Sequence, residues 1–237
     1  MLTHSFENVA QSFRILIESN WNYTRLLSVD RAEAIGNLES GINNQLNALH
    51  SLYDQMQALN LEPDWYLSPE LLTILVIRNA RHHNKANRIR TLPAYHRYSE
   101  SNPKSTKDYF YVDTTEMDDG GDFFNVPISW ADIDEMLSLP RKESRLKSDV
   151  RERVREYLNA EYFESVAQER GINKEDIFIN YVALAHNAGV TLYPYIKDKV
   201  TPDEDSIEAK AFLDIWASVK KGDTTNPTCS ILSFNLP

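Results

Sequence analysis

Apolar residues recur along most of the chain at the three- to four-residue spacing of helices that bury one face. The first such segment spans residues 5–27 and reads as one helix or two short ones. A second begins at Asp30, which has the spacing of a capping box with Glu33. Its apolar residues repeat every seven positions from Ile35 to Met56, and Gln45 interrupts them. We interpret this stripe as the core face of one long helix.

A third helix is predicted from about Pro69 to Arg88. Ser68, Pro69 and Glu70 are typical of a helix start, because a hydroxyl caps the first N–H groups, proline fits the first turn and an acid complements the helix dipole. Residues 71–77 are all apolar except for one threonine. Such a run predicts a helix that other helices surround.

Residues 93–128 interrupt the helical pattern. Proline, serine and asparagine mark loops here, and the residues 118–121, Asp-Asp-Gly-Gly, separate two short apolar runs. This arrangement is typical of a β-hairpin, which we place around residues 108–127. A two-stranded ribbon is marginally stable alone, so we expect it to be a small insertion that packs on the helices.

Helical patterns return in the second half of the chain. The predicted helices span about 130–139, 144–170, 173–192 and 201–222. Residues 223–237 show no helical or strand periodicity, and we predict that they form an extended C-terminal tail. The predicted fold class is therefore mainly α. We expect a helical bundle of about six to seven helices in a single domain, residues 1–222, with an inserted loop at 93–128.

Composition narrows the class of protein. Seven glycines and ten prolines in 237 residues are few for a β-sandwich, and the single cysteine, Cys229, precludes an internal disulfide. The longest apolar run is far too short to span a bilayer. The N-terminal residues also lack the basic and apolar regions of a signal peptide. We therefore expect a cytoplasmic protein without membrane association.

Positive charge is concentrated at the end of the predicted third helix. The whole chain has a net charge of −10, yet residues 71–99 contain no Asp or Glu, six Lys or Arg residues and three of the six histidines. Without that window the chain has 19 basic and 35 acidic residues, or a net charge of −16. Such a distribution argues against general coating of nucleic acid but is compatible with a local basic site.

Three residues in this window suit RNA cleavage without a metal or other cofactor. Asn79 and His83 are four residues apart and share a helix face, so the amide can orient the imidazole. Imidazole can accept the proton of a 2′-hydroxyl or protonate the leaving oxygen, and Arg78 can bind the phosphate and stabilise its developing charge. Arg78 and His83 lie about 140° apart around one helix axis, so they would meet across two antiparallel copies.

The residues 78–83, Arg-Asn-Ala-Arg-His-His, resemble the R-x(4–6)-H signature of the HEPN superfamily, in which a polar residue often follows the arginine. Arg78, Asn79 and His83 match it. The resemblance implies a helical bundle and a metal-independent endoribonuclease, of the kind found in toxin–antitoxin, phage-defence and CRISPR-linked systems. It also implies a homodimer in which two motifs form one cleft, with RNA as substrate and a cognate antitoxin as a further partner.

Neighbouring residues have weaker assignments. His82 is the second choice for the catalytic imidazole, and Arg81, Lys85, Arg88 and Arg90 are candidate RNA-binding residues that would contact flanking phosphates. The alternative is a non-catalytic helical interaction or RNA-binding module that uses residues 78–90 to bind an acidic partner. A third interpretation is a basic turn that complements the helix dipole and forms salt bridges with acids of its own chain.

Overall fold

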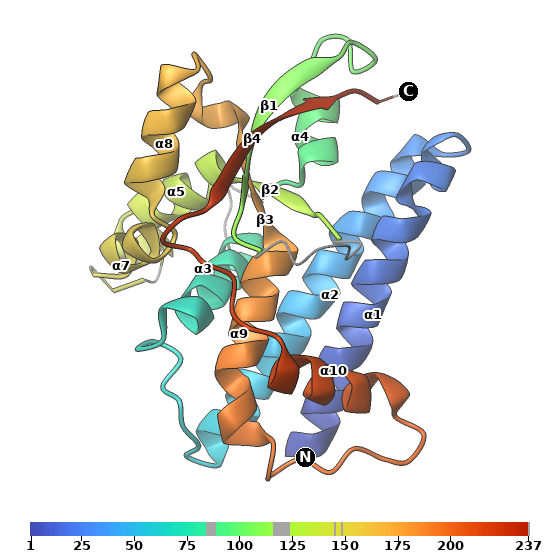
Figure 1. The fold of residues 1–237 in the computed structure, drawn as a ribbon, viewed down its shortest axis with the longest axis vertical. Coiled ribbons are helices and arrows are strands. Elements are labelled where there is room, and N and C mark those ends of the chain that lie inside the picture. The colour runs from blue at the N-terminus through green and yellow to red at the C-terminus, as the bar shows by residue number, and fades with distance from the viewer. Residues whose placement is uncertain (84–88, 116–123, 145, 148, 237) are drawn as a thin grey trace.

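Ten α-helices, a short 3-10 helix and four strands form the part of the chain that the computed structural model describes: residues 1–83, 89–115, 124–144, 146–147 and 149–236 (Figure 1). The α-helices are α1 (Leu2–Leu27), α2 (Arg31–Ala58), α3 (Pro69–His83), α4 (Leu92–Ser99), α5 (Trp130–Ser138), α6 (Arg141–Ser144), α7 (Val150–Tyr157), α8 (Ala160–Glu169), α9 (Tyr181–Ile196) and α10 (Ile207–Ser218). The strands are β1 (Lys107–Asp113), β2 (Pro127–Ser129), β3 (Ile177–Asn180) and β4 (Thr228–Phe234). The mainly α class is confirmed, with more helices than predicted and a small sheet.

The two longest helices, α1 and α2, lie side by side as an antiparallel hairpin (Figure 1). Asp30 caps α2, because its carboxylate accepts a hydrogen bond from the backbone N–H of Glu33 at 3.0 Å. The residues of the predicted seven-residue repeat, Ile35, Ile42 and Met56 among them, are buried. The prediction of one long helix with a core stripe is therefore confirmed.

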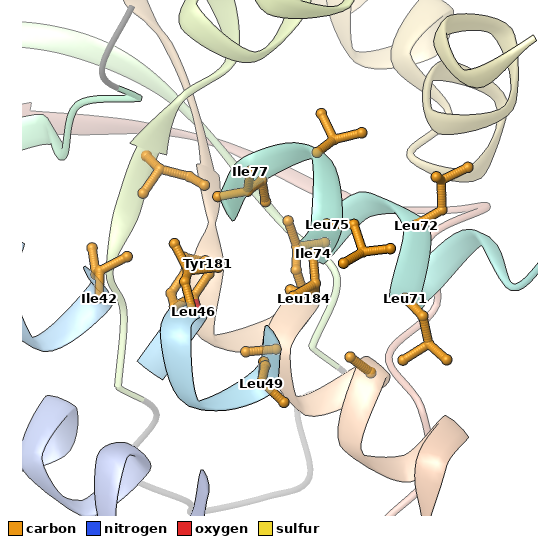
Figure 2. Close-up of a cluster of buried hydrophobic side chains, with 14 of the residues drawn as sticks. Ile42, Leu46, Leu49, Leu71, Leu72, Ile74, Leu75, Ile77, Tyr181 and Leu184 are labelled. Carbon is orange, nitrogen blue, oxygen red and sulfur yellow. The ribbon is translucent and has the colours of Figure 1, made fainter. Parts of the chain in front are cut away.

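Helix α3 is in the middle of the core. It begins at Pro69, and every residue from Leu71 to Ile77 is buried. Figure 2 shows its apolar side chains beside those of α2 and of α9, including Leu49 and Leu184. Because other elements surround α3, the direction of its last turns is fixed by packing. Its predicted extension to Arg88 lies outside the described residues.

The four strands form one mixed sheet in the order β2-β3-β1-β4. β1 pairs in parallel with β3 and antiparallel with β4, and β2 pairs antiparallel with β3. The predicted hairpin around residues 108–127 is wrong, because β3 lies between β1 and β2 and separates them. β1 and β2 are separated because the run Ile177–Asn180 forms a strand between them. Its four residues are all buried, and its backbone pairs with a strand on each side.

Three of the predicted helices are also wrong in extent. The predicted helix 201–222 is longer than the observed one, because α10 spans Ile207–Ser218. The predicted helix 144–170 is divided into α7 and α8, and between them Asn159 adopts a left-handed backbone conformation with φ 51°. Asparagine tolerates this conformation better than most residues. The predicted helix 173–192 begins later, at Tyr181, because the residues before it form β3 and Asn180 caps α9 through the N–H of Val182 at 3.2 Å.

The C-terminal tail is part of the sheet. β4 pairs along its whole length with β1, so that Tyr109 lies opposite Leu232. Beyond β4, the N–H of Leu236 donates to the carbonyl of Pro103 at 2.9 Å and the Leu236 side chain is fully buried. The tail therefore contributes β4 to the sheet, as the strand that pairs with one edge of β1.

A network of ion pairs joins three of the helices that lie between β2 and β3 in the chain. Asp134 of α5 is buried and accepts hydrogen bonds from Arg155 of α7, at 2.7 Å, and from Lys174. Arg155 also pairs with Glu164 of α8, to which the indole N–H of Trp130 donates at 2.7 Å. These contacts fix α5, α7 and α8 around the start of β3.

Among the helices that the structure describes, none has the length and apolar character needed to cross a membrane.

Candidate active site at the end of helix α3

The last turns of α3 carry polar residues on one side and pack on the other. Ala80 is fully buried, whereas Arg78 and Asn79 are half-buried. The apolar run that ends at Ile77 holds the helix in the core. Arg78 and Asn79 therefore project from a rigid element rather than from a loop, as precise positioning of a reacting group requires.

Arg78 lies beside Asn79 and at the wall of a pocket. Its Nη1 donates a hydrogen bond to the amide oxygen of Asn79 at 3.2 Å. Burial lowers the pKa of Arg78, and the charge of Asp54 opposes that shift. A guanidinium titrates so far above neutral pH that Arg78 remains charged under physiological conditions.

The pocket beside Arg78 has a volume of about 260 Å³ and lies between α2 and α3. Asn43, Leu46 and Asn47 of α2 line it, together with Arg78 and Arg81. Its polar groups are the amides of Asn43 and Asn47 and the guanidinium groups of Arg78 and Arg81, but Arg81 is already paired with Glu39 and bonded to Asn43. Guanidinium groups bind phosphate well, so Arg78 is the residue of this pocket that we expect to do so. The pocket offers a place for a phosphate next to the guanidinium of Arg78.

Asn79 has one hydrogen-bonding group committed to Arg78. Because its amide oxygen accepts from Arg78, the amide NH2 is the group that it can offer to an imidazole nitrogen of His83. If Asn79 orients the imidazole of His83, as predicted, it does so as a hydrogen-bond donor through its amide NH2.

The structure describes His82 and His83 by their positions in α3, not by their side chains. His83 is the last residue of the helix. It is four positions after Asn79 and five after Arg78, so the predicted offset of about 140° from Arg78 applies to the helix as it is observed. The geometry of the imidazoles lies outside the described part of the chain.

Arg81, a predicted RNA-binding residue, faces the interior. Its side chain is only 7% exposed and donates to Asn43 at 2.6 Å and to the carbonyl of Ile89 at 2.7 Å. It also forms an ion pair with Glu39 of α2. Its guanidinium is committed to these three groups, so in this arrangement it joins α2, α3 and the segment before α4.

Arg90, another predicted RNA-binding residue, is held by Asp132. The guanidinium makes two hydrogen bonds to that carboxylate, at 2.8 and 2.6 Å, and the backbone N–H of Arg90 makes a third at 2.9 Å. The hydrogen bond to Asp132 is the main reason that the pKa of Arg90 is raised. Lys85 and Arg88, the remaining predicted RNA-binding residues, lie outside the described residues.

Sequence reasoning did not identify Glu39 and Asp132 as part of this region. Glu39 accepts hydrogen bonds from the backbone N–H and the hydroxyl of Thr91, at 3.0 and 2.6 Å, in addition to pairing with Arg81. Both acids lie about forty positions or more from the groups that they bind. No local sequence pattern indicates an ion pair between residues so far apart. The excess of acidic residues in the rest of the chain shows only that carboxylates are present to pair with these arginines.

Comparisons of the chain with known protein families, with curated proteins and with solved structures found no match.

Proposed function

We propose that this protein is a metal-independent endoribonuclease whose catalytic residues are Arg78, Asn79 and His83. The observation that carries the proposal is the position of Arg78: half-buried on a rigid helix, bonded to Asn79, and at the wall of a pocket that the amides of Asn43 and Asn47 also line. His83 follows on the same helix. The sequence resemblance to HEPN ribonucleases supports the same assignment of roles.

The proposed reaction uses these residues as follows. The imidazole of His83 accepts the proton of a ribose 2′-hydroxyl, and the 2′-oxygen attacks the adjacent phosphorus. The bond from phosphorus to the 5′-oxygen of the next nucleotide breaks, and an imidazolium returns a proton to that oxygen. Arg78 binds the phosphate and stabilises the charge that develops on it, and Asn79 holds His83 in the required tautomer. The products are a 2′,3′-cyclic phosphate and a 5′-hydroxyl.

The proposed active form is a homodimer. On one helix, positions 78 and 83 lie about 140° apart around the axis, so we expect that a single copy does not bring both residues to one phosphate. Two α3 helices whose ends meet would place Arg78 of one copy near His83 of the other. A toxin or phage-defence role, with a cognate antitoxin as partner, is the biological setting that the resemblance suggests.

The test is a cleavage assay on total RNA with EDTA present. We expect the wild-type protein to cut and both Arg78→Ala and His83→Ala to lose at least a hundredfold in rate, since each removes a group that acts in the transition state. Arg141→Ala, at an exposed position of α6, and His4→Ala, at an exposed position of α1, are matched controls that should cut normally. Circular dichroism would establish that every variant is folded.

Two results would contradict the proposal. Equal cutting by the wild type and both variants would assign the activity to another site or to a contaminant. Failure of the folded wild-type protein to cut any RNA in the mixture would favour the alternative, a binding module for an acidic partner.

A further inference from the structure

One face of α2 is turned toward the last turns of α3. Arg81 donates a hydrogen bond to Asn43 of this face at 2.6 Å, and Asn47, one turn further along α2, lines the same pocket as Arg78. Because Arg78 is one turn before Arg81, the two helices run antiparallel here. The next residue of this face is His50, three positions after Asn47. His50 therefore lies beyond Asn47, on the side of Arg78 that is away from Arg81.

Asp54 continues this polar face of α2. Positions 43, 47, 50 and 54 fall within about 60° around the helix axis. Burial lowers the pKa of Arg78 and the negative charge of Asp54 opposes that shift, so this carboxylate lies within electrostatic reach of the guanidinium. Asn47 and Asp54 lie on either side of His50 along the helix, and both are near Arg78. His50 therefore belongs to the same region as Arg78 and its pocket.

The imidazole of His50 is held by two contacts. Its Nδ1 lies 3.2 Å from a carboxylate oxygen of Asp54, and its ring packs edge-on against that of Tyr53, with 5.7 Å between the centroids. Tyr53 packs in turn on the fully buried Trp65, with 5.2 Å between the centroids. The His50 side chain remains 24% exposed, so a substrate can reach it. This histidine is thus both oriented and accessible, as a proton-transfer group must be.

The proposed reaction needs a second proton-transfer group besides His83. The attacking and leaving oxygens lie roughly in line on opposite sides of the phosphorus, so the group that deprotonates one is badly placed to protonate the other. His50 suits the second step, because a neighbouring carboxylate favours the imidazolium form that a general acid requires. With Nδ1 directed at Asp54, proton exchange takes place at Nε2.

We propose that His50 is a further catalytic residue, the general acid that protonates the leaving 5′-oxygen, and that Asp54 is its positioning residue. The 2′-hydroxyl gives its proton to His83, the 2′-oxygen forms a bond to phosphorus, and the bond from phosphorus to the 5′-oxygen breaks. Nε2 of His50 gives its proton to that oxygen. Both imidazoles then exchange protons with water and return to their starting forms. The inference rests on the proposed ribonuclease function.

The first experiment compares cleavage of two RNAs with EDTA present. One is an oligonucleotide that the wild type cuts, and the other has sulfur in place of the 5′-oxygen at the cleaved bond. Thiols are far more acidic than alcohols, so the sulfur leaves as a thiolate and needs no general acid. We expect His50→Ala to lose at least about a hundredfold in rate on the first RNA and less than about fivefold on the second. His83→Ala removes the base and should lose rate on both.

Further variants separate proton transfer from a structural role. Asp54→Asn should show the same selectivity between the two RNAs with a smaller loss, and Asp54→Glu should recover part of that loss. The His4→Ala variant, at an exposed position of α1, is the matched control and should cut both RNAs normally. An ion pair between partly exposed side chains adds little to stability, so we expect every variant to fold, which circular dichroism checks.

The outcomes distinguish this inference from the proposed function. Cutting of the unmodified RNA by His50→Ala at the wild-type rate would overturn the inference and leave the proposed function intact. Equal losses on the two RNAs would also overturn it, because His50 would then act in binding or folding and not on the leaving oxygen. If the folded wild type cuts no RNA, the proposed function fails and the inference fails with it.

A mixing experiment tests which copy supplies His50 to each site of the proposed homodimer. His50 and Arg78 belong to one copy, and His83 comes from the other. An exchanged mixture of His50→Ala and His83→Ala should therefore recover part of the wild-type rate. A mixture of His50→Ala and Arg78→Ala should stay as inactive as its components, because neither of its sites is complete. Recovery of activity by this second mixture would contradict the placement of His50 beside Arg78.

Discussion

Gln45 departs from the apolar pattern of α2. It is fully buried, and neither its amide oxygen nor its amide nitrogen has a hydrogen-bond partner among the described residues. The neighbouring core positions, Ile42 and Leu49, are apolar. A buried amide without partners costs about 1–3 kcal/mol of stability, so Gln45 is a weak point of the helix hairpin.

Replacing Gln45 with leucine should stabilise the protein. The Gln45→Leu variant removes the unsatisfied amide and keeps a side chain of similar volume, so we expect the free energy of unfolding to rise by about 1 kcal/mol or more. Urea denaturation followed by circular dichroism measures this change. The exposed Gln57→Leu variant on the same helix should change it by less than about 0.5 kcal/mol. Destabilisation by Gln45→Leu would mean that the amide is satisfied in solution.

At the residue scale, the sequence identifies the candidate site but not the groups around it. Arg78 and Asn79 can be recognised because they are adjacent on one predicted helix and their geometry follows from the helix period. The internal pairing of Arg81 with Glu39 and of Arg90 with Asp132 depends on tertiary packing between distant segments. The local sequence pattern therefore could not reveal that Arg81 and Arg90 pair with acids of the same chain, and we predicted them as phosphate-binding residues.

At the scale of elements, the ion pairs of Asp134 and Glu164 make stability depend on pH. Burial opposes ionisation of both carboxyl groups, but hydrogen bonds from Lys174 and Arg155 to Asp134, and from Arg155 and Trp130 to Glu164, hold each pKa below its usual value. A carboxylate whose pKa is lowered on folding contributes stability above its unfolded pKa and loses it as the pH falls through the folded value. The unfolded values are about 4 for Asp and Glu.

We therefore expect stability to decline as the pH falls below about 4.5, because the unfolded state then binds more protons. The Asp134→Asn variant should be less stable than the wild type at pH 7, and its stability should fall less steeply at acid pH. Thermal unfolding between pH 3 and pH 7 measures both effects, with the exposed Asp198→Asn as a control that follows the wild type. Parallel curves for wild type and Asp134→Asn would contradict the role of the network.

The helices α1, α2 and α3 were predicted well, whereas the long predicted helix 144–170 and the short strands were not. α1, α2 and α3 have many repeats of their apolar stripe, which fixes both their type and their buried face. β3 has only four residues, all apolar or capping in character, and an apolar run of that length fits a buried strand or a helix equally well. Its parallel pairing with β1 joins residues such as Phe110 and Ile177, so no local turn indicates it.

At the scale of the whole molecule, the proposed active site requires two copies of the chain. One copy supplies a rigid helix with Arg78 beside a pocket, and His83 is the last residue of that helix, five positions further along. In a site shared between two copies, Arg78 of one copy acts together with His83 of the other, so the two residues need not meet on one helix. It also predicts that two inactive variants can complement each other, since a mixed dimer contains one intact Arg78 and one intact His83.

The most direct measurement of this account is cleavage of RNA, with EDTA present, by an exchanged mixture of Arg78→Ala and His83→Ala. Each variant alone should be inactive, and the mixture should recover a fraction of the wild-type rate, because mixed dimers assemble one complete site from two copies. A mixture that stays as inactive as its components, while the wild type cuts, would contradict a site shared between copies. Normal cutting by either variant alone would contradict the placement of the site on α3.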